Sequence, residues 1–170
     1  MGEKTHILVI DDEKNYLLVL QTLLEDEGYT VTALNDPETA LSFLRESEVD
    51  VVVTDMKMPR VSGEDVLKTV KKEWPYIPVL IMTAFGSIES AVDVMKYGAF
   101  DYITKPFSND ELLLSIHNAV ELSRAHQQYR LLQEPVLAAG AGQLRGVVDG
   151  EQELVVGEGL GYIIEGAVFH

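Results

Sequence analysis

The sequence predicts a doubly wound α/β domain with a central five-stranded parallel sheet. Two observations predict it: short apolar runs alternate with longer amphipathic stretches, and runs such as 51–53 and 79–82 are apolar at every position. Strands that are apolar on both faces are typical of parallel sheets covered on both sides by helices. The alternation therefore predicts five strands and five helices.

The predicted elements follow one another through the first 125 residues. The strands contain residues 7–10, 29–34, 51–53, 79–82 and 102–103. The helices contain residues 16–24, 40–44, 66–70, 88–95 and 112–122. Gly28 is typical of a residue that closes a helix, and Asp36 followed by Pro37 is typical of the start of the next one.

The last helix is predicted to begin near Ser108, in a sequence that resembles a capping box, and to end at about Gln133 before Pro135. The domain is therefore assigned to residues 4–125, and residues 126–134 to an extension of the helix that acts as a linker.

Residues 135–170 are predicted to form a glycine-rich tail. Two interpretations of it stay open: a small native module of short strands, or read-through or out-of-frame sequence. The second is suggested because 24 of residues 134–170 are Gly, Ala, Val, Asp or Glu, the types whose codons begin with G.

The composition excludes several classes of function. Thirteen basic against 28 acidic residues give a formal charge of −15, so the chain is not expected to bind nucleic acid directly. Cysteine is absent, which excludes disulfides, thiol catalysis and thiolate metal sites. No 18 apolar residues follow one another, and the N-terminus lacks a signal peptide pattern, so we expect a cytoplasmic protein without a membrane segment.

Polar side chains of related chemistry follow four of the five predicted strands. Asp11 and Asp12 follow the first, Asp55 the third, Thr83 the fourth and Lys105 the fifth. They are expected to share one site, because open parallel sheets bind ligands outside the carboxyl ends of their strands. Three crowded carboxylates raise each other's pKa unless a cation intervenes. Oxygen donors without Cys or His favour Mg²⁺ as that cation.

These groups suit the transfer of a phosphoryl group to a carboxylate. Asp55, central in the sheet, is the predicted nucleophile, and a metal ion with Lys105 would neutralise the oxygens of the transferred group. Thr83 could then donate a hydrogen bond to a phosphoryl oxygen. Each residue alone is a common loop or cap residue. Their agreement at four separate strand ends favours a functional site.

The same residues carry a resemblance to the receiver domain of bacterial two-component response regulators, a (βα)5, flavodoxin-like fold. It covers residues 4 to about 125. Its motifs are Ile-Leu-Val-Ile-Asp-Asp-Glu at 7–13, Val-Val-Val-Thr-Asp-Met-Lys-Met-Pro at 51–59 with Gly63 after it, Met-Thr-Ala-Phe-Gly at 82–86 and Gly-Ala-Phe-Asp-Tyr-Ile-Thr-Lys-Pro-Phe at 98–107.

The resemblance implies that Asp55 accepts phosphate from a sensor histidine kinase in a Mg²⁺-dependent reaction. Asp12, Asp55 and the backbone carbonyl of Lys57 would bind the metal ion, and Asp11 would assist through water. Such a chain is a phosphoacceptor with intrinsic autophosphorylation and autodephosphorylation chemistry rather than an enzyme.

The resemblance also implies a switch. Lys105 contacts the phosphoryl group, Thr83 closes on it, and Tyr102 turns inward as the switch aromatic. This biases the surface of the fourth helix, fifth strand and fifth helix between two arrangements that partners distinguish. The bond from Lys105 to Pro106 is expected to be cis.

The stretch from Met82 to Phe107 is similar to receivers of the nitrogen-regulation type, whose relatives activate transcription with the alternative sigma factor, sigma-54, through an ATPase domain. This sequence contains no Walker motif and no helix-turn-helix. Either the effector part has been cut away or the receiver acts alone, and the predicted output is transcription regulation by an effector domain absent from this sequence. We also expect a homodimer through the output surface or through the long last helix.

Two alternatives from other classes remain. A flavodoxin-like redox carrier shares the architecture, but needs a neutral phosphate loop where this chain has Asp11 and Asp12. A phosphohydrolase with an aspartate nucleophile usually has a second acid two residues later, where this chain has Lys57.

Overall fold

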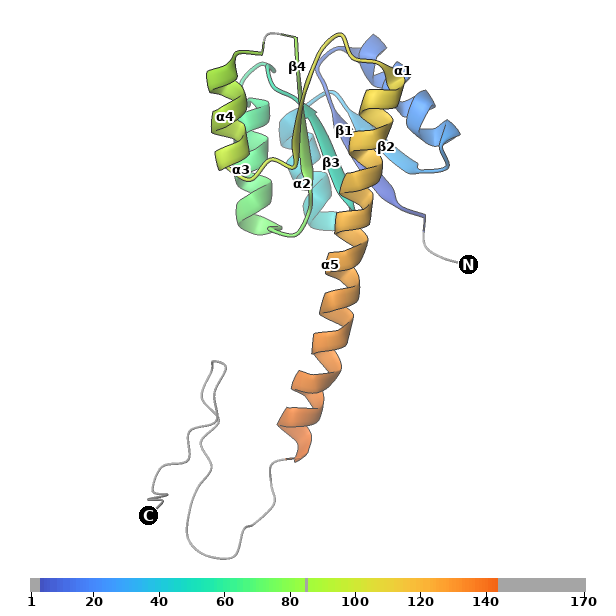
Figure 1. Cartoon of the computed structure of the whole chain (residues 1–170), viewed down its shortest axis with the longest axis vertical. Helices are drawn as coiled ribbons and strands as arrows, with labels where there is room; N and C mark the ends of the chain where they lie inside the picture. The colour runs from blue at the N-terminus through green and yellow to red at the C-terminus, as the bar shows by residue number, and fades with distance from the viewer. Residues whose placement is uncertain (1–3, 85, 144–170) are drawn as a thin grey trace, which may run out of the picture. The chain divides into compact units, whose positions relative to one another are not determined.

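The computed structural model describes residues 4–84 and 86–143, in which five strands and five helices alternate (Figure 1). The predicted alternation is confirmed. In chain order the elements are β1 (His6–Ile10), α1 (Lys14–Asp26), β2 (Thr30–Leu34), α2 (Pro37–Glu46), β3 (Val51–Asp55), α3 (Gly63–Glu73), β4 (Val79–Thr83), α4 (Ile88–Lys96), β5 (Asp101–Thr104) and α5 (Asn109–Gln143).

The strands form one parallel sheet in the order β2-β1-β3-β4-β5. Val53, for example, is paired with Val9 on one side and with Leu80 on the other. The chain moves from β1 to β2 on one side and then crosses to β3 on the other. The order therefore reverses between β1 and β3, which is where doubly wound sheets open a crevice for ligands.

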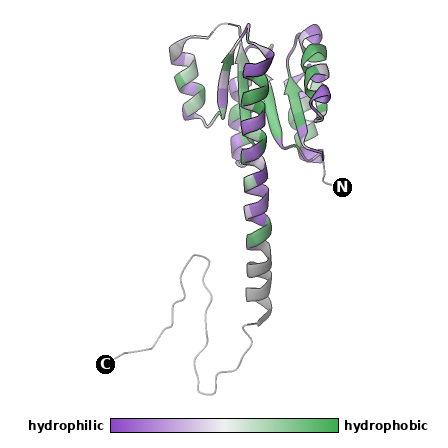
Figure 2. Ribbon diagram, turned by 45° about the vertical axis from the view of Figure 1, so that its right-hand side comes forward, coloured by the Kyte–Doolittle hydropathy of each residue, from purple (hydrophilic) through white to green (hydrophobic). Residues whose placement is uncertain are grey.

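Helices cover both faces of the sheet and create two apolar cores. Ile7 and Val9 of β1 pack with residues of α1 and α5, whereas Leu8 and Ile10 pack with residues of α2, α3 and α4. This alternation follows from the two-residue period of a strand. Figure 2 shows hydrophobic strands between helices that carry both hydrophobic and hydrophilic residues. The fully apolar strands that predicted the fold are thus buried from both sides.

Local signals begin and end the helices as the sequence indicates. The Asp36 carboxylate accepts a hydrogen bond of 2.9 Å from the backbone N–H of Thr39, with Pro37 in the first turn of α2. Gly28 follows α1 with a φ of +89°, a conformation that suits glycine. Ser108 caps α5 by accepting a hydrogen bond of 3.1 Å from the N–H of Glu111.

The prediction that Pro135 ends the last helix is wrong, because α5 continues to Gln143. Residues 135–143 therefore belong to the helix and not to the tail. A proline removes one helical hydrogen bond and costs about 3 kcal/mol, but this weakens a helix without forbidding it. The residues that follow include Leu137, Ala138 and Ala139, which are strong helix formers.

The chain divides into two compact units, residues 1–131 and 132–170. The first contains the whole sheet. The short strands predicted between residues 147 and 164 lie outside the described residues. Among the described helices, none combines the length and the apolar character that a membrane span requires.

Candidate functional site

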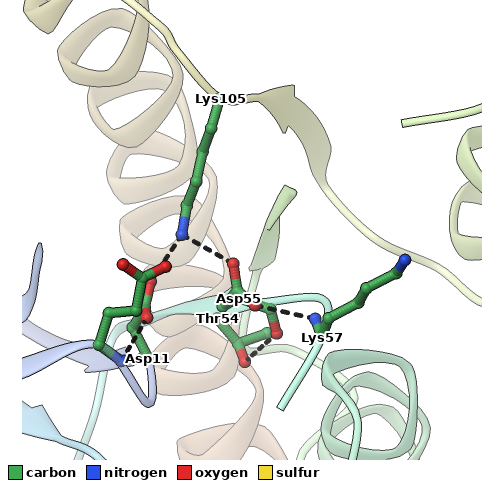
Figure 3. A network of polar contacts seen from close by, with 6 residues as sticks. Asp11, Thr54, Asp55, Lys57 and Lys105 are labelled. Atoms are coloured by element: carbon green, nitrogen blue, oxygen red, sulfur yellow. Dashed lines mark hydrogen bonds and ion pairs between the residues drawn. The ribbon is translucent and has the colours of Figure 1, made fainter. Parts of the chain in front are cut away.

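The ammonium group of Lys105 joins two carboxylates at the carboxyl ends of β1 and β3. Its Nζ lies 2.8 Å from Oδ2 of Asp11 and 2.7 Å from Oδ1 of Asp55 (Figure 3). Asp11 follows β1, Asp55 ends β3 and Lys105 follows β5, so the sheet brings together residues up to 94 positions apart. The three residues share one edge of the sheet, as expected from the sequence, and this edge includes the reversal of strand order.

Backbone amides hold the other oxygen of each carboxylate. The N–H of Glu13 donates to Oδ1 of Asp11 over 2.9 Å, and the N–H of Lys57 donates to Oδ2 of Asp55 over 2.8 Å. Each carboxylate therefore accepts one hydrogen bond from the backbone and one from an ammonium group. Charge-assisted bonds of this kind fix both the position and the rotation of the carboxylates.

The charged groups of the site are buried, which affects the pKa values of Asp55 and Lys105. The side chain of Asp11 is fully buried, and those of Asp55 and Lys105 are only 10% and 11% exposed. Burial raises the pKa of Asp55, against the opposite effect of its hydrogen bond with Lys105. For Lys105, burial lowers the pKa, but the hydrogen bonds with Asp11 and Asp55 outweigh it and the net pKa is raised. Asp55 is thus a more basic carboxylate than an exposed aspartate, which favours its use as a nucleophile.

The close packing of α3 against the end of β3 requires a glycine at position 63, eight positions after Asp55. A Cβ atom at Gly63 would lie 2.2 Å from the carbonyl oxygen of Asp55, so α3 could not begin so close to β3 with any side chain there. The Gly63 N–H also donates to the carbonyl of Met56 over 2.9 Å. In the loop between them, Arg60 adopts a φ of +68° and forms an ion pair of 3.0 Å with Asp36. The backbone after Asp55 is therefore held from two sides.

Thr83 ends β4 beside the site, with a side chain that is buried. Its backbone carbonyl accepts a hydrogen bond of 2.7 Å from the N–H of Lys105, and its register partner in β5 is Thr104. The structure therefore places Thr83 next to the strand that carries Lys105. Its predicted bond to a phosphoryl oxygen stays a prediction.

Tyr102 connects β5 with α4. Its half-buried ring packs against the α2, α3 and α4 core, and its hydroxyl lies 3.1 Å from Oγ of Ser90 in α4. The space around it is limited, because a Cβ atom at Gly86 would lie 3.1 Å from that hydroxyl. Tyr102 therefore links the end of β5 to α4, and its predicted role as the switch aromatic stays a prediction.

Of the residues predicted to hold a metal ion, Asp11 and Asp55 are brought together by their shared contact with Lys105. Asp12 is exposed, and the side chain of Lys57, whose backbone carbonyl is the predicted ligand, points away from the carboxylates (Figure 3). Within the described part of the chain, no three His, Asp or Glu side chains are arranged to hold a metal ion. The ammonium group supplies the positive charge between the two carboxylates. The metal roles of Asp11, Asp12, Asp55 and the Lys57 carbonyl stay predictions.

The sequence predicted neither Tyr16, which lies at the site, nor Ser90, which contacts Tyr102. The ring of Tyr16 in α1 faces Lys105, with Nζ 4.1 Å from the ring centroid, and meets Phe107 edge-on at 6.1 Å. Ser90 bonds to Tyr102, as described above. An aromatic residue in the first turn of the helix after Asp11 and Asp12 is a weak signal for Tyr16, and the sequence offers none for Ser90.

An open cavity of about 450 Å³ lies beside the site. Its walls come from α1, from the residue after β4 and from the segment after β5, and include Tyr16, Val19, Leu23, Ala84, Lys105 and Phe107. The peptide bond between Lys105 and Pro106 is cis, as the resemblance implies. On the adjoining surface of α1, Leu18 and Val19 are 65% and 61% exposed. The site thus opens onto an apolar surface.

Comparison with known proteins identifies the family. The family described as response regulator receiver domain matches residues 7–117, which is more than half of the chain. The chain therefore belongs to the response regulator receiver domain family. Receiver domains act as signalling switches that interact with histidine kinases and generally use Mg²⁺ for phosphorylation. Membership does not support the two alternatives, a redox carrier and a phosphohydrolase.

The relatives are regulatory proteins longer than this chain. The transcriptional regulatory protein ZraR of Klebsiella oxytoca is 40% identical over 148 residues, which cover 87% of this chain and 32% of that protein. The regulatory protein AtoC of Escherichia coli is 36% identical over 128 residues, covering 75% of this chain and 28% of the relative. The chain thus spans about a third or less of the length of these relatives.

Solved structures agree with this result. A response regulator receiver domain protein from Clostridium thermocellum is 39% identical with a TM-score of 0.68, and the match covers 71% of this chain and 98% of that one. NtrX from Brucella abortus is 32% identical with a TM-score of 0.70, and the match covers 76% of this chain and 30% of that one. The predicted fold class is confirmed.

Proposed function

We propose that this chain is a phosphorylation switch in which Asp55 accepts a phosphoryl group from a sensor histidine kinase. The observation that carries the proposal is the position of Lys105, whose ammonium contacts both Asp11 and Asp55 at the reversal of strand order. An aspartate held beside a buried cation has a group at hand that can neutralise the oxygens of an incoming phosphoryl group.

In the proposed transfer, an oxygen of Asp55 forms a bond to phosphorus as the bond between phosphorus and the histidine nitrogen breaks. The electron pair of that bond stays on the nitrogen. Both Asp55 oxygens accept a hydrogen bond in the structure, and a carboxylate oxygen keeps a second lone pair for the attack. Lys105 then moves its hydrogen bond from Asp55 toward a phosphoryl oxygen, and Thr83 donates to another.

The donor set suits a magnesium ion. The available groups are carboxylate and carbonyl oxygens, which hard cations prefer. Asp12, Asp55 and the carbonyl of Lys57 would hold the ion, and Asp11 would assist through water. Bound there, the ion would supply positive charge to the oxygens of the transferred group. Of these groups, the structure holds the Asp11 and Asp55 carboxylates in fixed orientations through the N–H groups of Glu13 and Lys57.

The apolar surface of α1 supports a protein as the phosphoryl donor. Leu18 and Val19 are largely exposed on α1, next to the cavity that Lys105 and Phe107 line. Exposed apolar side chains beside a reactive group are typical of an interaction site. A kinase domain that covers this surface would bring its phosphohistidine to Asp55 and would exclude water from the transfer.

The response is proposed to follow from Thr83 through Tyr102 to α4. When Thr83 moves toward the phosphoryl group, Tyr102 turns further inward and gives up its contact with Ser90. The face formed by α4, β5 and α5 then changes its balance between two arrangements. This face, or the long α5, is also the proposed homodimer interface. The output is proposed to be sigma-54-dependent transcription regulation in the cytoplasm, carried out by an effector domain.

Incubation with Mg²⁺ and acetyl phosphate tests the proposal, with intact mass spectrometry as the readout. One phosphoryl group should be added, stable in acid and labile in base, and Asp55→Asn should abolish it. Asp65→Asn, at an exposed carboxylate in α3, is the matched control and should leave the labelling unchanged. Labelling that persists in Asp55→Asn, or that does not require a divalent ion, would contradict the proposal.

A further inference from the structure

The ammonium group of Lys105 is held on three sides, and the third side is an aromatic ring. Besides the carboxylates of Asp11 and Asp55, the Tyr16 ring lies against it, with its centroid 4.1 Å from Nζ. A cation at this distance from the face of a ring is attracted by the ring's negative face. The resemblance gives roles to both carboxylates and to the lysine, and it gives none to Tyr16.

The position of the ring is itself fixed. Tyr16 meets Phe107 edge-on at a centroid distance of 6.1 Å, and it packs against the core formed by α1 and α5. Its hydroxyl is partly desolvated by burial, which raises the pKa of this tyrosine, so the side chain stays neutral. A neutral ring packed in this position forms one side of the surroundings of Lys105.

The ring contact matters because the other contacts of Lys105 change during the proposed reaction. A lysine side chain is flexible, and its ammonium can point in many directions when a partner is lost. Once phosphorus bonds to Asp55, that carboxylate loses most of its negative charge and holds Lys105 less strongly. The contact with Tyr16 does not depend on which oxygen Lys105 binds, so the transfer does not by itself remove it.

We propose that Tyr16 is a positioning residue for phosphoryl transfer, whose ring keeps the ammonium of Lys105 at the mouth of the site while its hydrogen bond passes from Asp55 to the phosphoryl group. This inference rests on the proposed function of Asp55. It predicts that the ring face is required and the hydroxyl is not.

Four variants separate the ring from the hydroxyl and from simple packing. Tyr16→Phe keeps the ring, Tyr16→Trp strengthens its negative face, and Tyr16→Leu keeps apolar volume without a ring. Tyr29→Leu is the matched control, because Tyr29 is also half-buried against the same core but lies before β2, at the opposite edge of the sheet.

The rate of phosphorylation by acetyl phosphate with Mg²⁺ is the first readout. Tyr16→Leu should slow it by about 3- to 10-fold, the size expected when one partly buried cation–π contact is lost. Tyr16→Phe should stay within about twofold, and Tyr16→Trp should equal or exceed the wild type. A wild-type rate in Tyr16→Leu, or an equal loss in Tyr16→Phe, would overturn the inference.

A double-mutant cycle distinguishes positioning from a general structural effect. In a Lys105→Met background, the change Tyr16→Leu should have no further effect on the residual rate, because the ammonium that the ring holds is absent. If the same 3- to 10-fold loss persists in that background, Tyr16 acts through the fold and the inference is wrong.

A second readout does not require phosphorylation, so failure of the inference and failure of the proposed function can be told apart. The ring should shift the NMR signals of the Lys105 Hε protons upfield, and this shift should disappear in Tyr16→Leu and persist in Tyr16→Phe. A wild-type protein that shows the shift but takes no phosphate contradicts the proposed function. A wild-type protein that is phosphorylated without the shift contradicts the role of Tyr16.

Discussion

The site at the ends of β1 and β3 and the segment around α4 are built in opposite ways. Asp11 and Asp55 are buried, and each accepts hydrogen bonds on both oxygens. In α4, Val94 is fully buried among the described side chains, whereas Val92 and Met95 are 45% and 47% exposed. The carboxylates of the proposed phosphorylation site thus lie on constrained strands, whereas the proposed response surface includes a weakly packed helix.

Helices α1 and α4 also differ in how tightly they are packed. Helix α1, beside the site, buries Leu17, Leu20 and Leu24 against the sheet. Helix α4 is held by Val94 and by the contact between Ser90 and Tyr102. Weakly packed elements open at lower free energy than the global unfolding transition, and elements that move are drawn from them. The contrast therefore indicates that α4 can move while the site stays fixed.

The largest effect is expected from Lys105→Met, which removes the ammonium between the two carboxylates. Asp11 and Asp55 would be left buried with like charges and no counter-ion. We expect urea unfolding at neutral pH to show that the free energy of unfolding falls by about 3–5 kcal/mol. Lys72→Met, at an exposed position of α3, should change the stability by less than about 0.5 kcal/mol. Equal effects of the two changes would mean that the site is not a constrained centre.

Truncation of one buried side chain on each side tests the packing contrast. Leu20→Ala in α1 should lower the global free energy of unfolding by about 2–5 kcal/mol. Val94→Ala in α4 should cost about 1–2 kcal/mol. In hydrogen exchange, the change Val94→Ala should accelerate the amides of α4 and leave those of β1 and β3 protected. Equal acceleration in β1 and β3 would show that α4 does not open separately.

A side chain at Gly63 should disturb the constrained side locally. In Gly63→Ala, the added Cβ would overlap the carbonyl oxygen of Asp55, so the backbone must shift. We expect the free energy of unfolding, measured in urea, to fall by about 1–3 kcal/mol, which is the usual cost of overpacking. Phosphorylation of Asp55 by acetyl phosphate should also slow. Lys72→Ala in the same helix controls for the substitution by alanine, and a normal phosphorylation rate in Gly63→Ala would argue against the close approach.

The smallest expected effects are at two helix caps, and only one should depend on pH. Both α3 and α4 begin with a capping box, formed by Ser62 with Asp65 and by Ser87 with Ser90. Ser62→Ala and Ser87→Ala should each cost about 1 kcal/mol at neutral pH. The hydrogen bonds of Asp65 with the hydroxyl and the backbone N–H of Ser62 lower the pKa of this aspartate.

The sign of the pH dependence follows from that lowered pKa. The stabilisation from Asp65 is fully present above about pH 4, the pKa range of an unfolded aspartate, and is lost as the pH falls through the lower pKa of the folded state. Urea unfolding of Asp65→Asn should therefore show its cost at neutral pH and not in acid. The cost of Ser87→Ala should be the same in acid, because Ser90 does not titrate. A pH-independent cost for Asp65→Asn would contradict the assignment.

The parts of this molecule that were predictable from the sequence are those with a repeated pattern. Apolar runs identified the strands. The polar residues after these runs included Asp11, Asp55 and Lys105, which the structure brings into contact because parallel strands end at one edge. The roles predicted for Asp12 and Thr83 stay predictions. The cation–π contact of Tyr16 depends on how α1 packs beside the segment after β5. No pattern within one element specifies such a contact between elements.

Single residues that disfavour an element were harder to weigh. Pro135 was expected to end the last helix, yet α5 continues beyond it. One proline has a finite penalty, which neighbouring residues of high helix propensity can offset. A rule that considers the proline alone leaves out their contribution. The need for glycine at position 63 was likewise not predictable, because the backbone oxygen that excludes a side chain there belongs to Asp55 in another element.

Hydrogen exchange of the same protein before and after phosphorylation of Asp55 tests most directly whether reaction and response lie on separate parts of the fold. With full modification confirmed by mass, amide protection should change in α4 and β5 and stay the same in β1 and β3. No change in α4, or an equal change in β1 and β3, would contradict the division between a fixed site and a moving helix.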